Sequence, residues 1–142
     1  QFEKLEIPLT LSNITGHEYR LDTFHFDFAP RQSQPGRHGP RNFILTYDSG
    51  DLDDADGTQI DSQSNLPIAI SNNLQIAEEG DYPDYDYTLA RVLRDTVLAD
   101  GESATFKIVF SGYSRTDTSS IVDNIAFTGV RFIRQPTVFV VR

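Results

Sequence analysis

The sequence of 142 residues contains no cysteine, no methionine and no tryptophan. Without cysteine, neither disulfide bonds nor thiolate metal sites can form. Without tryptophan, the chain lacks the largest aromatic surface for stacking on a sugar. The absence of methionine, even at position 1, predicts a processed product or an excised domain. No apolar run approaches the length of a bilayer span, so we expect no membrane insertion.

Basic residues are also scarce. The chain has 12 Lys and Arg against 21 Asp and Glu, a net charge of −9. Phosphate contacts need clustered Lys and Arg, so the composition argues against nucleic acid and anionic membrane surfaces. Residues 42–90 contain no Lys or Arg at all. We therefore expect one strongly acidic end or edge of the fold, which leaves cations and neutral ligands as partners.

The sequence is rich in short segments that alternate apolar and polar residues. They lie around residues 7–11, 24–28, 43–47, 85–89, 104–110, 121–127 and 137–142, and turn-rich stretches separate them. Such short strands joined by Gly, Asp, Asn and Pro are typical of an antiparallel sandwich. The length fits one core. We predict an all-β fold, a single two-sheet β-sandwich domain over residues 1–142.

Residues 88–99 carry the best helix signal. Leu89, Val92, Leu93 and Val97 approximate a helical stripe. The neighbouring segments are all strand-like, so we favour a strand ending near Val92, a turn and a short second strand.

An acidic segment spans residues 48–61. It includes Asp51, Asp53, Asp54 and Asp56, with glycines that permit tight turns. Ca²⁺ takes six to eight oxygen ligands, which such a loop can supply. The spacing differs from that of an EF-hand, because the glycine is one position late and the final glutamate is missing. A calcium site and a solvated acidic loop both remain open.

The stretch "SSIVDNIAFTG", residues 119–129, places a carboxylate within an apolar alternation. Asp123 shares its parity with Ile121, Ile125 and Phe127. A buried carboxylate costs several kcal/mol unless it is neutralised or well hydrogen-bonded. Either Asp123 binds a cation, or it lies at a sheet edge or bulge and accepts hydrogen bonds from backbone N–H groups.

A second acidic cluster, "EEGDYPDYDY" at residues 78–87, contains three tyrosines. Tyrosine rings beside carboxylates suit a sugar, whose C–H face stacks while its hydroxyls donate hydrogen bonds. Tyr85 and Tyr87 continue the parity of Leu89, so we expect them to face inward. Tyr82 lies beside Pro83 in a loop and is the freer candidate for a ligand contact.

Catalytic motifs are missing. The three histidines are too scattered to indicate zinc, and the chain has no nucleophile elbow and no phosphate-binding glycine loop. Carboxylates are abundant, but a glycosidase cleft usually needs a larger scaffold than this one. We therefore expect that the protein is not an enzyme.

Two longer stretches carry a resemblance. They are "HEYRLDTFHFDFAPRQSQPGRHGPRNFILTY" and "LADGESATFKIVFSGYSRTDTSSIVDNIAFTG". Both resemble secreted bacterial β-sandwich domains of exported proteins with Pro-Glu-Pro sorting signals, relatives of jelly-roll carbohydrate-binding modules. The resemblance implies a jelly roll and an extracellular or cell-surface location. No sorting tail occurs in this sequence, and "VRFIRQPTVFVVR" extends past the usual last strand.

The resemblance also implies a calcium site. In many jelly-roll modules an Asp of the last strand binds a structural Ca²⁺ together with residues near the first strand. Asp123 stands at the matching place, and Glu3 or Glu6 would complete the site.

Two functions follow as expectations. The first is a non-catalytic, extracellular, calcium-stabilised module that binds a polysaccharide or glycan through Tyr82, Tyr113, Arg31 and Arg41. The arginines would pair with sugar hydroxyls, uronates or sulfates. The second is a structural subunit of a fibre, surface layer or adhesive matrix. It would assemble through its strand-like terminal segments, "FEKLEIPLTL" and "TVFVVR".

Overall fold

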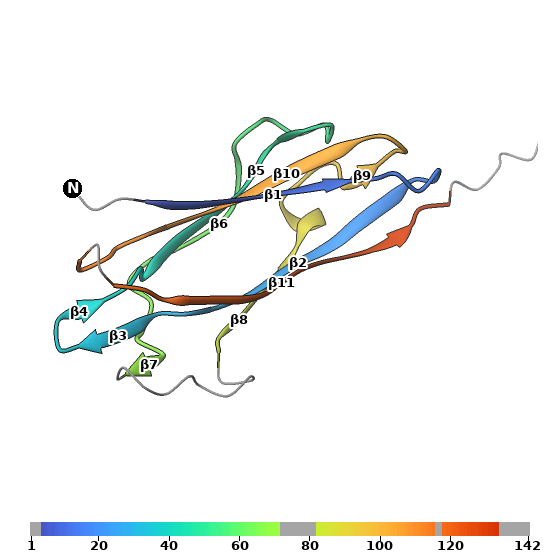
Figure 1. Ribbon diagram of the computed structural model, residues 1–142. Coiled ribbons are helices and arrows are strands. Elements are labelled where there is room, and N and C mark those ends of the chain that lie inside the picture. The colour runs from blue at the N-terminus through green and yellow to red at the C-terminus, as the bar shows by residue number, and fades with distance from the viewer. Residues whose placement is uncertain (1–3, 72–81, 116–117, 134–142) are drawn as a thin grey trace, which may run out of the picture.

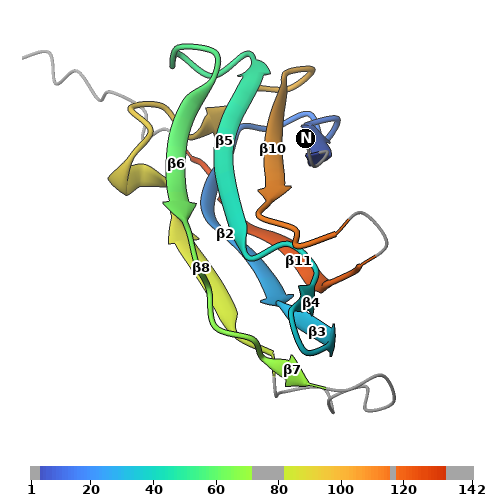
Figure 2. The same cartoon turned by 90° about the vertical axis from the view of Figure 1, so that its left-hand side faces the viewer.

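A computed structural model describes residues 4–71, 82–115 and 118–133 of the chain. These residues form two antiparallel sheets that pack face to face (Figures 1 and 2). The predicted all-β, two-sheet sandwich is confirmed. The described part of the chain holds no helix with the length and hydrophobicity of a membrane span.

The strands of both sheets interleave along the sequence. Sheet A has the order β1 (Leu5–Ser12), β10 (Ser103–Ser111), β5 (Asn42–Gly50) and β6 (Thr58–Gln63). Sheet B has the order β11 (Ile121–Arg131), β2 (Tyr19–Ala29) and β8 (Asp84–Thr88), and β9 (Val97–Leu98) pairs with the start of β2. A small third sheet contains β4 (Arg37–His38), β3 (Arg31–Gln34) and β7 (Ile70–Ser71), with β3 and β7 parallel.

The core lies between sheets A and B and is unusually aromatic. Alternate residues of β2, β5 and β10 are fully buried, as their sequence alternation predicts. They include Phe24, Phe26, Phe28, Phe43, Leu45, Tyr47, Phe106, Ile108 and Phe110. Phe26 of sheet B meets Phe43 of sheet A edge to face, with ring centroids 5.1 Å apart. Such tilted and edge-on pairs are the arrangements that aromatic rings favour.

The segment that carried the helix signal is a strand, a turn and a short strand. β8 ends at Thr88, a 3₁₀ turn covers Leu89–Arg91, and β9 follows. The expected strand end near Val92 is therefore wrong, whereas the short second strand is confirmed. The turn begins early because it brings Leu89 and Leu93, four residues apart, into the core together.

β11 changes its inward face halfway along. Val122 and Phe127 both pack against the core although their parities differ. The change occurs at a bulge, where the pairing with β2 shifts between Asp123 and Ala126 and Asn124 has a φ of +49°. A bulge inserts an extra residue and reverses which side chains face inward beyond it.

This bulge determines the surroundings of Asp123. Its side chain is exposed, so the expectation of a desolvated carboxylate is wrong. One oxygen accepts a hydrogen bond from the N–H of Asn124 at 2.8 Å. The structure thus shows a bulge at which the carboxylate accepts from a local backbone N–H, and calcium binding by Asp123 stays a prediction.

Candidate functional site

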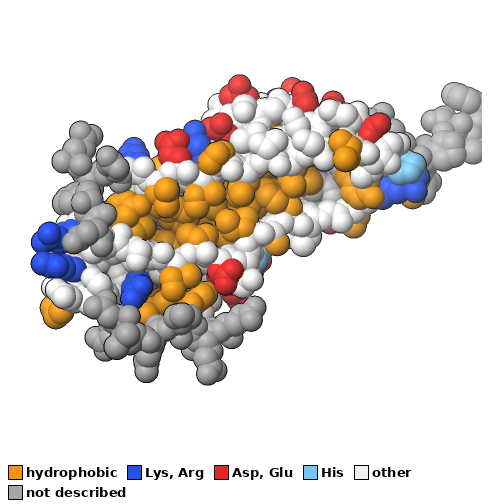
Figure 3. Space-filling view, viewed as in Figure 1, with side chains coloured by type: hydrophobic (Ala, Val, Ile, Leu, Met, Phe, Trp, Pro, Cys, Tyr) orange, Lys and Arg blue, Asp and Glu red, His pale blue; other side chains and the backbone are white. Residues whose placement is uncertain are grey.

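An apolar groove runs along one open side of the sandwich, between β1 and β11. Its walls are half-buried side chains that also contact the core: Ile7, Leu9 and Leu11 from β1, and Val122 and Phe127 from β11. In the space-filling view this groove is the long orange band across the molecule (Figure 3). A continuous apolar band on a protein surface commonly marks a contact surface.

The groove is open because β1 and β11 are both edge strands. Within the described strands, β1 pairs only with β10, and β11 pairs only with β2. Each therefore has one side of its backbone available to pair with an added strand. Pro8 and the two bulges of β11 reduce this capacity locally. The remaining parts of both edge strands keep backbone groups that can pair with an added strand.

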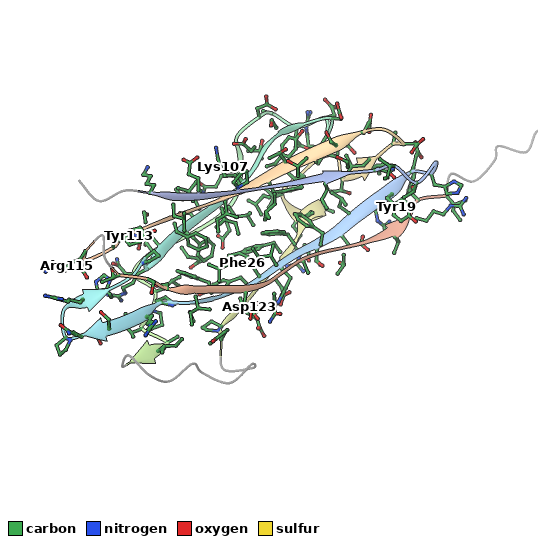
Figure 4. The ribbon with its side chains drawn as sticks, viewed as in Figure 1. Tyr19, Phe26, Lys107, Tyr113, Arg115 and Asp123 are labelled. Carbon is green, nitrogen blue, oxygen red and sulfur yellow. The ribbon has the colours of Figure 1, made fainter. Side chains whose placement is uncertain are left out.

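A cavity lies near each end of the groove. One, of about 320 Å³, is lined by Leu11, Tyr19, Leu21, Leu98 and Phe127 among others. The other, of about 150 Å³, is lined by Leu5, Phe28, Phe110, Tyr113 and Val122 among others. Figure 4 shows Tyr19 and Tyr113 towards opposite ends of the molecule. Both linings combine apolar side chains with Ser and Thr residues, and their apolar parts suit the side chains of an added strand.

Two of the predicted functional segments fall outside the described residues. They are Glu3, expected near a calcium ion, and the terminal segment 137–142, expected to pair with a neighbour. Their roles stay predictions. The described chain runs past the end of β11, where the Phe132 N–H donates to the Glu18 carbonyl at 2.8 Å. Phe127 and Gly129, in the second half of β11, help to line the larger of the two cavities.

The four expected sugar contacts lie around one end of the sandwich, but they do not form one exposed surface. Tyr82 is only 8% exposed and packs with Ala29 and Ile70 in a small second cluster, so the expectation that it is the freer tyrosine is wrong. The Arg41 guanidinium donates to the carbonyls of Leu66 and Asn65, which gives it a structural role.

Tyr113 and Arg31 are half-buried at the same end. Tyr113 lines the smaller cavity, and burial raises the pKa of its hydroxyl. The Arg31 backbone N–H donates to the Ser120 hydroxyl at 3.2 Å. The ligand roles of Tyr113 and Arg31 stay predictions.

The acidic loop, residues 51–56, uses its carboxylates to hold its own position. Asp54 accepts hydrogen bonds from the N–H groups of Arg94 and Asp95 at 3.1 and 3.0 Å. Asp51 accepts one from the Ser103 N–H at 2.8 Å. Asp53 and Asp56 are exposed. The loop is thereby anchored to the segment before β9, and calcium binding by these acids stays a prediction.

Tyr85 and Tyr87 face inward, as their parity predicts. Tyr85 stacks on Phe26 with ring centroids 5.3 Å apart. The Tyr87 hydroxyl donates to Asp61 at 2.6 Å. Burial opposes ionisation of Asp61, but hydrogen bonds from Gln63 and Tyr87 outweigh it and hold the pKa of that carboxyl below its usual value.

One group that the sequence reasoning missed lies on the outer face of sheet B. We call His25, Asp27, Asp84, Asp86 and Asp123 the sheet-B cluster. In the registers of the sheet, His25 is opposite Asp86, and Asp27 is opposite both Asp84 and Asp123. A nitrogen of His25 and oxygens of Asp27 and Asp84 lie within 4.8 Å of one another, a spacing suited to one metal ion.

The electrostatics of this cluster reflect its crowding. A hydrogen bond to Asp86 raises the pKa of His25, although partial burial acts against it. A side-chain hydrogen bond with Asp27 raises the pKa of Asp84. The alternation of "FHFDF" and "DYDYT" could have placed these residues on one face. The register that brings the two segments together could not be predicted from the sequence.

The chain matches no known protein family, no curated protein and no solved structure. The class of protein that the fold defines is an all-β, antiparallel two-sheet sandwich. The resemblance to exported jelly-roll domains stays a prediction from short motifs.

Proposed function

We propose that this protein is a non-catalytic structural subunit, extracellular as its motifs suggest, that assembles by inserting a strand into the groove of a neighbouring copy. The apolar groove between β1 and β11 is the observation that supports it. Two sheet edges and the core between them are open along one side of the described domain. An added strand would pair with an edge through its backbone and fill the cavities with its side chains.

The proposed occupant is residues 137–142 of the second copy, with the sequence TVFVVR. Its central residues are apolar at both parities, which is typical of a strand covered on both faces. Alternate side chains would enter the groove, and the others would pack over β1 or β11. Residues 134–142 contain two arginines and no acid, in a chain whose net charge is −9. The charge difference favours the approach of this segment to another copy.

The path of β11 sets how residues 137–142 would enter a groove. Its arrowhead lies at the Tyr19 end of the molecule, where the described chain ends at Ile133 (Figures 1 and 4). Entry into the groove of the same chain would require a hairpin turn within residues 134–136, and the trapping experiment below distinguishes that outcome from insertion into a second copy. Extended residues span about 3.3 Å each, so the six residues would extend about 20 Å along a groove.

The absence of cysteine allows a direct test by disulfide trapping. Leu9→Cys and Val140→Cys are prepared as separate single variants and mixed under oxidising conditions. We expect a disulfide-linked heterodimer, identified by mass spectrometry. Ile44→Cys with Val140→Cys serves as the matched control, because Ile44 is exposed on the outer side of sheet A. A doubly substituted chain that links only to itself, with no heterodimer in the mixture, would contradict assembly between copies.

Surface substitutions supply a second, independent measurement. Leu5 lines the smaller cavity and is 49% exposed, whereas Ile44 is 37% exposed and lies away from the groove. Leu5→Lys is expected to weaken self-association at least about tenfold in analytical ultracentrifugation, an effect of about 1.4 kcal/mol. Ile44→Lys should leave it unchanged. Equal behaviour of the two variants would argue against the groove.

Carbohydrate binding is a second candidate, and one specific observation favours it. Arg31, Arg37, Arg41 and Arg115 gather around β3, β4 and the segment after β10, and Figures 3 and 4 show the basic end. In an acidic protein this basic end suits a glycan that carries uronates or sulfates.

A pull-down with a sulfated polysaccharide, against a neutral one, tests this candidate. Arg31→Gln with Tyr113→Ala should reduce retention, and Arg94→Gln, which lies beside the acidic loop, should not. Retention that is identical for all variants would remove this candidate. The proposed calcium stabilisation has its own test, since a bound ion raises the melting temperature and EDTA should lower it.

A further inference from the structure

The sheet-B cluster lies apart from the groove, on the face of sheet B that points away from the core. β2 places Phe24, Phe26 and Phe28 inward, so His25 and Asp27 face outward. The paired positions of β8 and β11 bring Asp84, Asp86 and Asp123 to the same face. Like charges directly opposite each other in a sheet are destabilising, so this arrangement needs a positive group among the carboxylates.

Asp27 is the most buried carboxylate of the sheet-B cluster. It is only 5% exposed. One carboxylate oxygen accepts a hydrogen bond from the Asn124 side-chain amide at 2.5 Å. Its other oxygen, Oδ1, is buried and accepts no hydrogen bond from the described residues, and the His25 Nε2, 3.1 Å away, forms an ion pair with it only when the imidazole is protonated. A buried carboxylate oxygen without a donor is costly, and such atoms in folded proteins usually indicate a missing ligand or ion.

His25 is oriented as a metal ligand would be. Its Nδ1 lies 2.8 Å from Asp86 Oδ1, a hydrogen bond in which the ring donates when Nδ1 carries the proton. This tautomer turns the lone pair of Nε2 towards Asp27, whose Oδ1 is 3.1 Å away. A histidine that donates to a carboxylate with one nitrogen and binds a metal with the other is a recurring arrangement.

From these contacts we infer that His25, Asp27 and Asp84 bind a divalent transition-metal ion, with Zn²⁺ as the appropriate probe. The three ligand atoms lie within 4.8 Å of one another, close enough to surround one ion after small side-chain shifts. One imidazole with carboxylates suits zinc or manganese better than calcium, which prefers oxygen ligands alone. Asp86 acts as a positioning residue, because it holds the imidazole without contacting the ion.

The proposed ion would join β2 to β8, since its ligands come from both strands. Asn124, at the bulge of β11, supports Asp27 from the other side. Asp84 is exposed, so the ion would keep one side open to water. The site therefore serves as a clamp on the outer face of sheet B, and its formation does not depend on assembly through the groove.

Isothermal titration calorimetry on the full, chelator-treated chain tests this inference. Zn²⁺ is expected to bind with a stoichiometry of one and to raise the melting temperature, whereas Ca²⁺ at the same concentration should do so far less. Co²⁺ provides a spectroscopic check, because nitrogen and oxygen coordination alters its visible absorption.

Three variants test the proposed ligands and the positioning residue against a remote control. His25→Gln and Asp84→Asn should each weaken Zn²⁺ binding at least about tenfold, and Asp86→Asn, which disturbs only the orientation of the imidazole, by about 10- to 100-fold. Asp53→Asn changes an equally acidic but remote position and should bind as the unmodified chain does.

Asp84 is exposed, so loss of folding should not obscure its variant. Circular dichroism of each chelator-treated variant verifies this. Zn²⁺ affinity that is unchanged in both His25→Gln and Asp84→Asn would overturn the site. Tight Ca²⁺ binding that His25→Gln leaves intact would overturn the choice of metal class.

Discussion

Two acidic regions of this molecule differ in what faces their carboxylates. In the acidic loop, Asp54 accepts hydrogen bonds from two backbone N–H groups, and Asp51 accepts one. In the sheet-B cluster, Asp27 is opposite a carboxylate on each neighbouring strand, and one of its oxygens is buried without a hydrogen-bond donor. The loop has the higher density of Asp residues in the sequence, but the carboxylates of the cluster have fewer backbone donors and depend on His25 for positive charge.

The difference shows that the number of acids in a segment is a poor guide to a metal site. Turn residues present free N–H groups, and nearby Asp side chains accept from them. Residues in the middle of a sheet have their N–H groups engaged in the ladder, so outward side chains must find other partners. A carboxylate on such a face is neutralised by a proton, a basic side chain or an ion.

The largest expected effect concerns the loop. Asp54→Ala should lower the free energy of unfolding by about 2 kcal/mol, because two hydrogen bonds to a charged acceptor are lost. The Asp54 side chain is only 5% exposed, so water replaces these contacts incompletely. Urea denaturation measures the change, and we expect the same value with EDTA and with Ca²⁺.

Asp53→Asn is the matched control, since the Asp53 side chain is 92% exposed. Its effect should stay within about 0.5 kcal/mol, as for most surface substitutions. A different outcome would be that Ca²⁺ stabilises the unmodified protein but not Asp54→Ala. That result would mean that the loop, like the cluster, binds a cation, and it would support the calcium prediction for the loop.

A smaller effect is expected where a tyrosine, rather than the backbone, satisfies an acid. Tyr87→Phe removes the hydrogen bond to Asp61 and should cost about 1 kcal/mol at neutral pH. The folded-state pKa of Asp61 lies below its usual value. Asp61 therefore contributes stability that is fully present above its unfolded-state pKa and is lost as the pH falls through its folded-state pKa.

The variant should accordingly show a shallower loss of stability between about pH 5 and pH 3 than the unmodified chain. Unfolding free energies measured across this range test the prediction. Identical slopes would show that Tyr87 does not assist the ionised form of Asp61.

Much of the fold was predictable because alternation survives in the core strands. The phenylalanines of "FHFDF" and "SATFKIVFS" are buried as their parity indicates. Burial on one face imposes a two-residue period on a strand, so the sequence of each segment indicates both the strand and its buried face. The end of β8 was misplaced because the 3₁₀ turn follows from tertiary packing of Leu89 and Leu93.

The sites were less predictable because they depend on register and bulges. Asp123 was expected on the apolar face, and the bulge at Asn124 reverses that face. Tyr82 was expected in an exposed loop, yet it is buried against Ala29 and Ile70. His25 was set aside as one of three scattered histidines. Its partners, Asp84 and Asp86, lie about sixty residues away in the sequence and meet it only through the pairing of β2 with β8.

The smallest expected effect tests the comparison most directly. Removing a carboxylate is expected to destabilise the acidic loop but not the sheet-B cluster. With chelator present, Asp27→Asn should leave stability unchanged or raise it by up to about 1 kcal/mol, since it removes a like-charge pair across the strands. An asparagine oxygen can still accept from Asn124, and its amide can donate to Asp84. Asp123→Asn is the control, because that side chain is exposed and should change stability less. A clear loss of stability in Asp27→Asn would mean that a protonated His25 already forms a stabilising ion pair with Asp27. The carboxylates of the cluster, like those of the loop, would then have their partners within the protein and need no metal ion.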